Sequence, residues 1–329
     1  MTLNNCISCL RLPLLLLGAL IASAETSAQN LSKLSPMQQL EIQQVNGLDP
    51  TARLEDRVKE TPADILKQFQ EAGMAPKSHQ LTAAEKEIVS SAFALLPPLH
   101  RRVLKTRLRS ISFLDNMPNT ALTGPVNTDT EFRLYHITIR AAILRQTVSE
   151  WLTEKEKTCF DTTGSPLRVS INAGSLNALV YVLLHESTHV LDGSLGITPG
   201  LIPVNETEML GQANPLTAKI WEDRTLPAKQ YRGTLLDSTR YRRGKILPVT
   251  RAVEVYEALS HTPFVSLYST SSWHEDLAEL LTVYQLTQKL NQPFRISVID
   301  KDKKEIYFYE PMKSVLVKNR ITQLKLFYF

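Results

Sequence analysis

Length, composition and charge are those of an ordinary globular protein. The chain has 329 residues, of which 43% are hydrophobic, so it can bury one large core or two modest ones. The net charge is only +4, from 37 basic and 33 acidic side chains. That balance gives no reason to expect a nucleic acid or an anionic membrane surface as a partner, and we expect no nucleic-acid partner.

The first 24 residues have the pattern of a secretory signal peptide. Arg11 precedes an apolar run at 12–22, and the small residues Ala22 and Ala24 indicate cleavage after Ala24. The run is shorter than the roughly 20 residues that span a bilayer, and no later segment reaches that length. We therefore expect a secreted or periplasmic protein without stable membrane insertion. Of its three cysteines only Cys159 would remain, so no internal disulfide is expected.

Residues 25–105 are predicted to form a helical N-terminal region. The stretch "LTAAEKEIVSSAFALL" at 81–96 has the apolar spacing of a helix. Pro97 and Pro98 interrupt it, because proline lacks the backbone donor and clashes with the preceding turn. A new helix is therefore expected in "LHRRVLKTRL", at 99–108.

From residue 106 to residue 329 the pattern predicts a mixed domain, which makes the fold class α+β. β-Branched and aromatic residues alternate as in strands at 110–115, 131–140 and 166–171, and the turn-rich stretch "NMPNTALTGPVNTDT" separates the first two. The intervening segment at 141–160 is predicted to be helical.

The second half of this domain is predicted to be mostly helical, with one hairpin. A helix begins near Ser175 and ends at Asp192, with Gly193 as a left-handed stop. Long loops and short helices around a cleft are expected at 193–250. Helices at 250–259 and 272–290, a hairpin at 294–310 and a terminal helix complete the chain.

The motif "HESTH" lies in the middle of the helix at 175–192. His185 and His189 are four positions apart, so they share a helix face and can direct two imidazole nitrogens at one point. In this HExxH arrangement the histidines bind zinc, and Glu186 is the general base. Core or surface histidines without a ligand are the alternative, but Glu186 would then be a buried carboxylate without a partner.

A catalytic zinc also needs a third protein ligand. The metzincin spacing fails, because Asp192 and Leu195 stand where a glycine and a histidine are required. Glu275 is the best candidate, and Glu279, four positions later, can orient a ligand histidine through its other ring nitrogen. His274 faces another side of that helix, and we expect Asp276 at the surface or in a supporting role.

"HESTH" followed by "EDLAE" resembles the gluzincin group of zinc metallopeptidases, over residues 175–284. Tyr268, seven positions before Glu275, is similar to a tyrosine of the anthrax lethal factor-like branch that supports the reacting carbonyl. A buried tyrosine with a structural role is the alternative for Tyr268.

The resemblance implies a zincin-like catalytic domain with a mixed sheet, an active-site helix and a glutamate helix. It implies one Zn²⁺ per chain, held by His185, His189 and Glu275, which lowers the pKa of a water molecule to about 7. Glu186 would take a proton as this water attacks a peptide carbonyl, and Tyr268 would donate to the oxyanion. "YHITIR" at 135–140 is the candidate edge strand for an extended peptide.

These features favour an exported zinc-dependent endopeptidase whose partner is a protein or peptide substrate. Two alternatives stay open: an exported metal-binding or scaffold protein without catalysis, and a hydrolase of a non-protein amide such as a cell-wall crosslink. The sequence indicates neither the substrate nor the oligomeric state.

Overall fold

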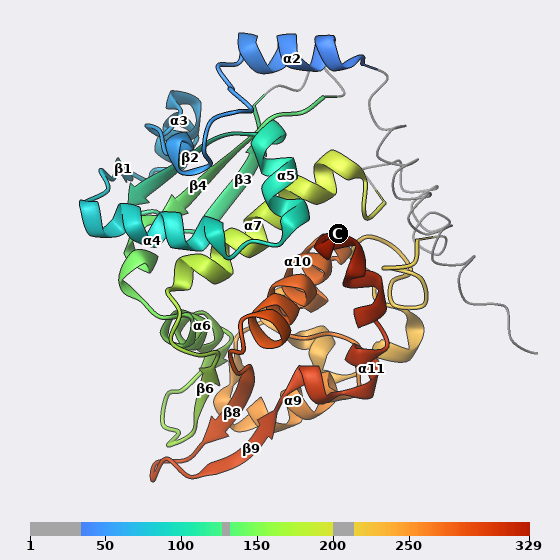
Figure 1. Ribbon diagram of the computed structural model, residues 1–329. Coiled ribbons are helices and arrows are strands. Elements are labelled where there is room, and N and C mark those ends of the chain that lie inside the picture. Colours follow the sequence, from blue (N-terminus) through green and yellow to red (C-terminus); the bar gives the residue numbers. More distant parts are fainter. Residues whose placement is uncertain (1–33, 127–131, 200–213) are drawn as a thin grey trace, which may run out of the picture.

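The computed structural model describes residues 34–126, 132–199 and 214–329. The fold is mixed α+β, as the sequence predicts. Figure 1 shows one sheet with helices α4, α5 and α7 in front of it, and a second group of helices with a smaller sheet below. The predicted signal peptide lies outside the described residues. No helix in the described ranges is long and apolar enough to cross a membrane.

The larger sheet has four strands in the order β1-β2-β4-β3. The central pair is parallel, and both outer strands run antiparallel to their neighbours. The strands are β1 (Lys77–Ser78), β2 (Leu108–Asp115), β3 (Ala121–Pro125) and β4 (Tyr135–Arg140). The predictions for β2 and β4 are confirmed, although β4 begins later than expected.

The edge strand was predicted wrongly. β4 lies between β2 and β3, so both of its edges are paired and it cannot receive a peptide. The edge strand next to β4 is β3, which lies within the stretch predicted as turns. Gly124 and Pro125 disfavour a strand in isolation, but edge strands tolerate proline.

Four α-helices precede β2 in the described residues, and two of them, α4 and α5, pack onto the same core as the later elements. They are α2 (Pro36–Val45), α3 (Ala63–Glu71), α4 (Ala83–Ala94) and α5 (Pro98–Arg107). α4 and α5 confirm the helices predicted on either side of Pro97. Side chains of both join one hydrophobic cluster with α7, so this region helps to support the histidine helix.

The two faces of the sheet have different coverings, as the alternation of side chains along a strand requires. Ile111 and Phe113 join the core that contains α4, α5 and α7, whereas Leu114 packs against Phe69 of α3. The central strands are therefore covered on both sides, and β3 remains at the margin.

α7 spans Ala178–Leu195, three residues later than predicted at each end. Asn177 caps its start, because its side-chain oxygen accepts from the backbone of Leu179. Gly193 is helical, and the left-handed stop is Gly196, with φ of 59°. A Cβ atom on Gly193 would lie 2.4 Å from the Tyr135 hydroxyl oxygen, so close packing explains this glycine.

The segment predicted as one helix at 141–160 is divided. A 3-10 helix at Ala141–Arg145 precedes α6 (Val148–Lys157). Thr147 and Glu150 form a capping box that starts α6, a signal that the sequence contained.

The remaining elements form the lower part of the molecule in Figure 1. β6 (Arg168–Asn172), β8 (Arg295–Ile299) and β9 (Glu305–Tyr309) make an antiparallel sheet that confirms the predicted strand at 166–171 and the hairpin. The α-helices are α9 (Ala252–Ser260), α10 (Trp273–Tyr284) and the short α11 (Val315–Lys318). α10 continues into a π-helical turn at Gln285–Lys289, and a 3-10 helix at Ile321–Tyr328 follows α11.

The predicted loop region contains little regular structure in its described part, residues 193–199 and 214–250. Short 3-10 helices occur at Lys229–Tyr231, Leu235–Ser238 and Arg240–Arg242, and β5 (Phe160–Asp161) pairs with β7 (Leu247–Pro248). Residues 200–213 of that prediction lie outside the described residues.

Candidate metal centre

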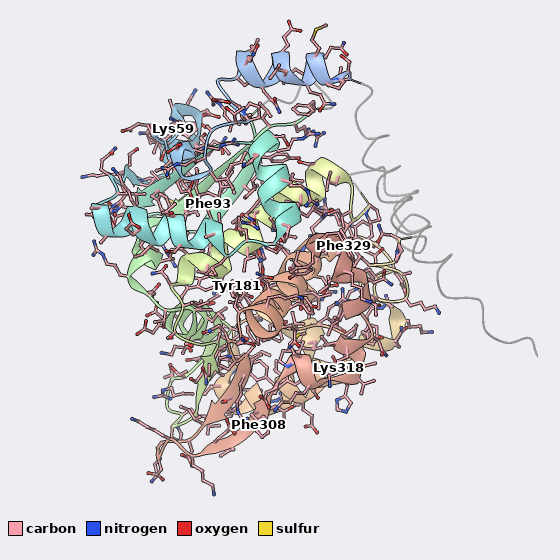
Figure 2. The ribbon with its side chains drawn as sticks, in the orientation of Figure 1. Lys59, Phe93, Tyr181, Phe308, Lys318 and Phe329 are labelled. Atoms are coloured by element: carbon pink, nitrogen blue, oxygen red, sulfur yellow. The ribbon has the colours of Figure 1, made fainter. Side chains whose placement is uncertain are left out.

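The structure brings together the three predicted ligands, which lie 90 positions apart at most. His185 and His189 lie one turn apart on α7, and Glu275 lies in the first turn of α10. Ser272 caps α10 by accepting from the backbone of Glu275, which fixes where this carboxylate emerges. Figure 2 labels Tyr181, one turn before His185, near the middle of the molecule where α7 meets the lower helices.

The three candidate donor atoms lie close enough together to share one zinc ion. Nε2 of His185 lies 2.9 Å from Oε2 of Glu275 and 3.1 Å from Nε2 of His189, and the third edge, from His189 to Glu275, is 3.3 Å. With zinc bonds of about 2.0–2.1 Å, neighbouring ligand atoms lie about 3.3 Å apart. Within the described residues this is the one cluster of three potential ligands with donor atoms so close together. The donor set therefore fits zinc.

Glu279 lies behind the cluster, where it contacts the other ring nitrogen of His185. Its Oε1 is 3.1 Å from His185 Nδ1, an ion-pair distance although off the line of a well-aligned hydrogen bond. Its Oε2 accepts from the hydroxyls of Tyr181, at 2.8 Å, and Ser266, at 2.6 Å. Lys155 approaches Oε1 to 3.9 Å, so four groups surround a carboxylate that is only 1% exposed.

The acidic and basic groups of the cluster shift one another's pKa values. Burial opposes protonation of His185, but Glu275 and Glu279 outweigh it and raise the pKa of His185 to about 10. Burial opposes ionisation of Glu279, but Lys155 and His185 lower its pKa to about 2. Glu275 likewise overcomes its burial through both histidines, and its pKa falls well below the usual range. The carboxylates are therefore ionised and ready to bind a cation or a proton.

Glu186 faces a cavity beside the cluster rather than the cluster itself. Its Oε2 accepts from the Thr123 hydroxyl of edge strand β3 at 2.6 Å. The cavity has a volume of about 590 Å³, and its lining includes His185, Glu186 and Tyr268. A small molecule or peptide side chain in it would touch both the histidine helix and this carboxylate.

Tyr268 lies next to His185, one of the three candidate ligands. Its ring stacks on His185, with centroids 5.7 Å apart and an angle of 26° between the planes. The Lys155 ammonium lies 4.0 Å above the centre of the Tyr268 ring. Burial, followed by the charges of Glu275 and Glu279, raises the pKa of the phenol. Tyr268 is therefore a protonated hydrogen-bond donor at the wall of the cavity.

Two neighbours of Glu275 have structural partners. His274 points away from the cluster, as predicted, and its Nδ1 lies 2.7 Å from Oδ2 of Asp192. The expectation that Asp276 lies at the surface is wrong: it is 1% exposed and accepts two hydrogen bonds from Arg320 and one from Trp221. Its partner lies 44 positions away, beyond the reach of helical spacing.

The other histidines have separate polar partners. His79 lies between Glu85 and Asp115, and His100 bonds to Thr188. His136 bonds to Ser110 and Ser112, and His261 to a backbone carbonyl of its own helix. None of them belongs to the cluster of His185, His189 and Glu275.

Sequence reasoning missed four residues around the site. Tyr181 could have been found, since it lies four positions before His185 on the same helix face. Thr123, Lys155 and Ser266 come from other elements and carry no local signal, because their roles depend on the tertiary fold.

Comparison with known proteins adds no family to this description. No family model, curated protein or solved structure matches the chain. What the site can do must be argued from its own residues.

Proposed function

We propose that the chain is an exported zinc-dependent metalloendopeptidase of the gluzincin type, with a zincin-like catalytic domain at 106–329. One observation carries the proposal: two histidines of one helix and a glutamate of another place three ligand atoms 2.9–3.3 Å apart beside Glu186. Nε2 of both histidines lies next to the same carboxylate oxygen of Glu275, as it would around one shared metal ion.

His185, His189 and Glu275 would hold the zinc. When bound, zinc supplies Lewis acidity for the attack of water on an amide carbonyl. Glu279 orients His185 from behind, because a carboxylate at Nδ1 leaves Nε2 free to act as the ligand.

Glu186 is the proposed general base. Thr123 donates to one carboxylate oxygen and thereby holds the side chain toward the cavity. The carboxylate takes a proton from the attacking water and then returns it to the leaving amine nitrogen. Tyr268 donates a hydrogen bond to the oxygen on which negative charge develops.

The substrate is proposed to be a protein or peptide bound in extended form. β3 is an edge strand with no partner on its outer side among the described residues, and its Thr123 contacts Glu186. A peptide that adds a strand to this edge would pass next to the base. Cleavage of the segment 1–24 would place the enzyme outside the cytoplasm, in the periplasm or the medium.

The Glu186→Gln variant of the protein from residue 25 onward tests the proposal. Because Glu186 is not a zinc ligand, the variant should keep its zinc but hydrolyse casein about 10²- to 10⁴-fold more slowly than the zinc-loaded wild type. Glu257→Gln, at an exposed position of α9, is the matched control and should retain full activity. Unchanged hydrolysis by Glu186→Gln would contradict the mechanism, and cleavage of purified peptidoglycan but not casein would contradict the substrate class.

A further inference from the structure

The cavity beside Glu186 is lined by basic side chains as well as by residues of the histidine helix. Three cationic side chains line it: Arg140, Lys155 and Arg240. They come from the end of β4, from α6 and from the 3-10 helix Arg240–Arg242. Three separate elements thus bring positive charge to one cavity.

Arg140 is the cation that lacks an internal partner. It ends β4, and its backbone N–H donates to Thr120 at 2.9 Å, which fixes where the side chain leaves the strand. Its Nε is completely covered, yet no acceptor for it is present among the described residues. The other guanidinium nitrogens of Arg140 make no hydrogen bond or ion pair within the described residues, so they are the atoms that can take a ligand in the cavity.

The other two cations are partly engaged. The Lys155 ammonium lies 3.9 Å from Glu279 and against the ring of Tyr268, so it belongs to the support of the metal cluster. Arg240 donates from Nη1 to the carbonyl of Thr158 at 3.0 Å and is exposed, which leaves the rest of its guanidinium free at the rim.

The carboxylates of the cavity do not neutralise Arg140. Glu154 accepts from the side chain of Gln146 at 2.6 Å on the exposed side of α6. Glu186 is held by Thr123. Neither carboxylate is paired with Arg140, so its guanidinium stays available to a ligand in the cavity.

We propose that this cavity binds a carboxylate of the peptide substrate, with Arg140 as its main partner and Arg240 at the rim. The inference rests on the proposed peptidase function, and it defines the substrate class as peptides with an acidic group close to the bond that is cleaved. A guanidinium offers two parallel N–H donors to a carboxylate, which gives both attraction and orientation. Since Glu186 and Tyr268 line the same cavity, the acidic group lies within a residue or two of the scissile bond.

The carboxylate has two possible sources with the same chemistry: an Asp or Glu side chain, or the C-terminus of the peptide. Three matched peptides separate them: one with Gln and an amidated end, one with Glu and an amidated end, and one with Gln and a free end. Their equilibrium binding to the zinc-loaded Glu186→Gln variant is measured by fluorescence polarisation, so that turnover does not interfere.

At least one carboxylate peptide should bind 10-fold or more tightly than the neutral peptide. Arg140→Gln should abolish the preference, Arg140→Lys should retain part of it, and Arg240→Gln should weaken it less than Arg140→Gln. Arg145→Gln, at an exposed position outside the cavity, should leave it unchanged. A preference for the Glu side chain indicates an endopeptidase subsite, and a preference for the free end indicates recognition of the C-terminus.

Equal binding of all three peptides would overturn the inference, and so would a preference that survives Arg140→Gln. Failure of the proposed function looks different: the carboxylate preference persists in the binding assay, but wild type hydrolyses none of the peptides. Hydrolysis by wild type without any preference for acid would retain the peptidase and reject the basic subsite.

Discussion

Glu279 gives the sharpest prediction about the proposed metal site, because it touches His185, a proposed ligand, without being a proposed ligand itself. Glu279→Gln keeps the size of the side chain and an oxygen that can accept from Tyr181 or Ser266. It removes the negative charge 3.1 Å from His185 Nδ1 and the partner of Lys155. The ring of His185 then loses the group that orients it and raises its basicity.

The expected magnitude follows from this single lost contact. Removing the carboxylate behind a ligand histidine typically weakens metal binding about 10- to 100-fold, which is about 1.4–2.8 kcal/mol. The lower bound applies if the neutral amide still holds the ring, and the upper bound applies if the ring also rotates. The fold should persist, because α7 and α10 are packed by many buried apolar side chains besides this contact.

Zinc affinity is measured by competition with a chromophoric chelator. Glu156→Gln is the matched control: Glu156 is also a buried glutamate bonded to a tyrosine hydroxyl, that of Tyr256 at 2.6 Å. Glu156 has no contact with the histidines, so its variant should bind zinc as wild type does. Equal zinc affinity of Glu279→Gln and wild type would refute the role given to Glu279.

Three further predictions concern the packing around the site and are tested by urea unfolding. Burial raises the pKa of Glu156 to about 7, so the folded state holds this proton more tightly than the unfolded state does. The free energy of unfolding of wild type should therefore fall by about 3 kcal/mol as pH rises from 4.5 to 7. Glu156→Gln should flatten that fall, and an unchanged pH profile would contradict the prediction. Asp276→Ala should cost about 3–5 kcal/mol because it leaves Arg320 buried and unpaired, and a loss below 1 kcal/mol would count against this pair. Gly193→Ala should cost about 1–3 kcal/mol through its clash with Tyr135, and Tyr135→Phe should recover part of the loss.

The sequence was sufficient where the controlling interactions are local. Apolar periodicity and proline located α4 and α5, and alternation located β2 and the β8–β9 hairpin. Spacing on one helix also placed His185 beside His189. Glu275 was correctly predicted to lie near the two histidines, because the apolar pattern of its helix is clear and the helix begins at a serine cap.

The features that were predicted wrongly from the sequence depend on contacts between residues far apart in the chain. β3 becomes a strand only because β4 pairs with it, and so the edge next to Glu186 was assigned to the wrong strand. Asp276 is buried because Arg320 arrives from the C-terminal segment. Gly193 lies within α7 rather than at its stop, and the hydroxyl of Tyr135 occupies the space where its side chain would be. These contacts join residues far apart in the chain, and no local pattern encodes them.

The zinc content of the purified protein, from residue 25 onward, tests the central claim most directly. Wild type, His189→Ala and Glu275→Ala are loaded with zinc, dialysed against metal-free buffer and measured by elemental analysis, with Glu257→Gln as control. Wild type and the control should hold about one zinc per chain, and both ligand variants should lose it. Metal-free wild type, or full zinc retention by Glu275→Ala, would contradict the three-ligand site and the mechanism built on it.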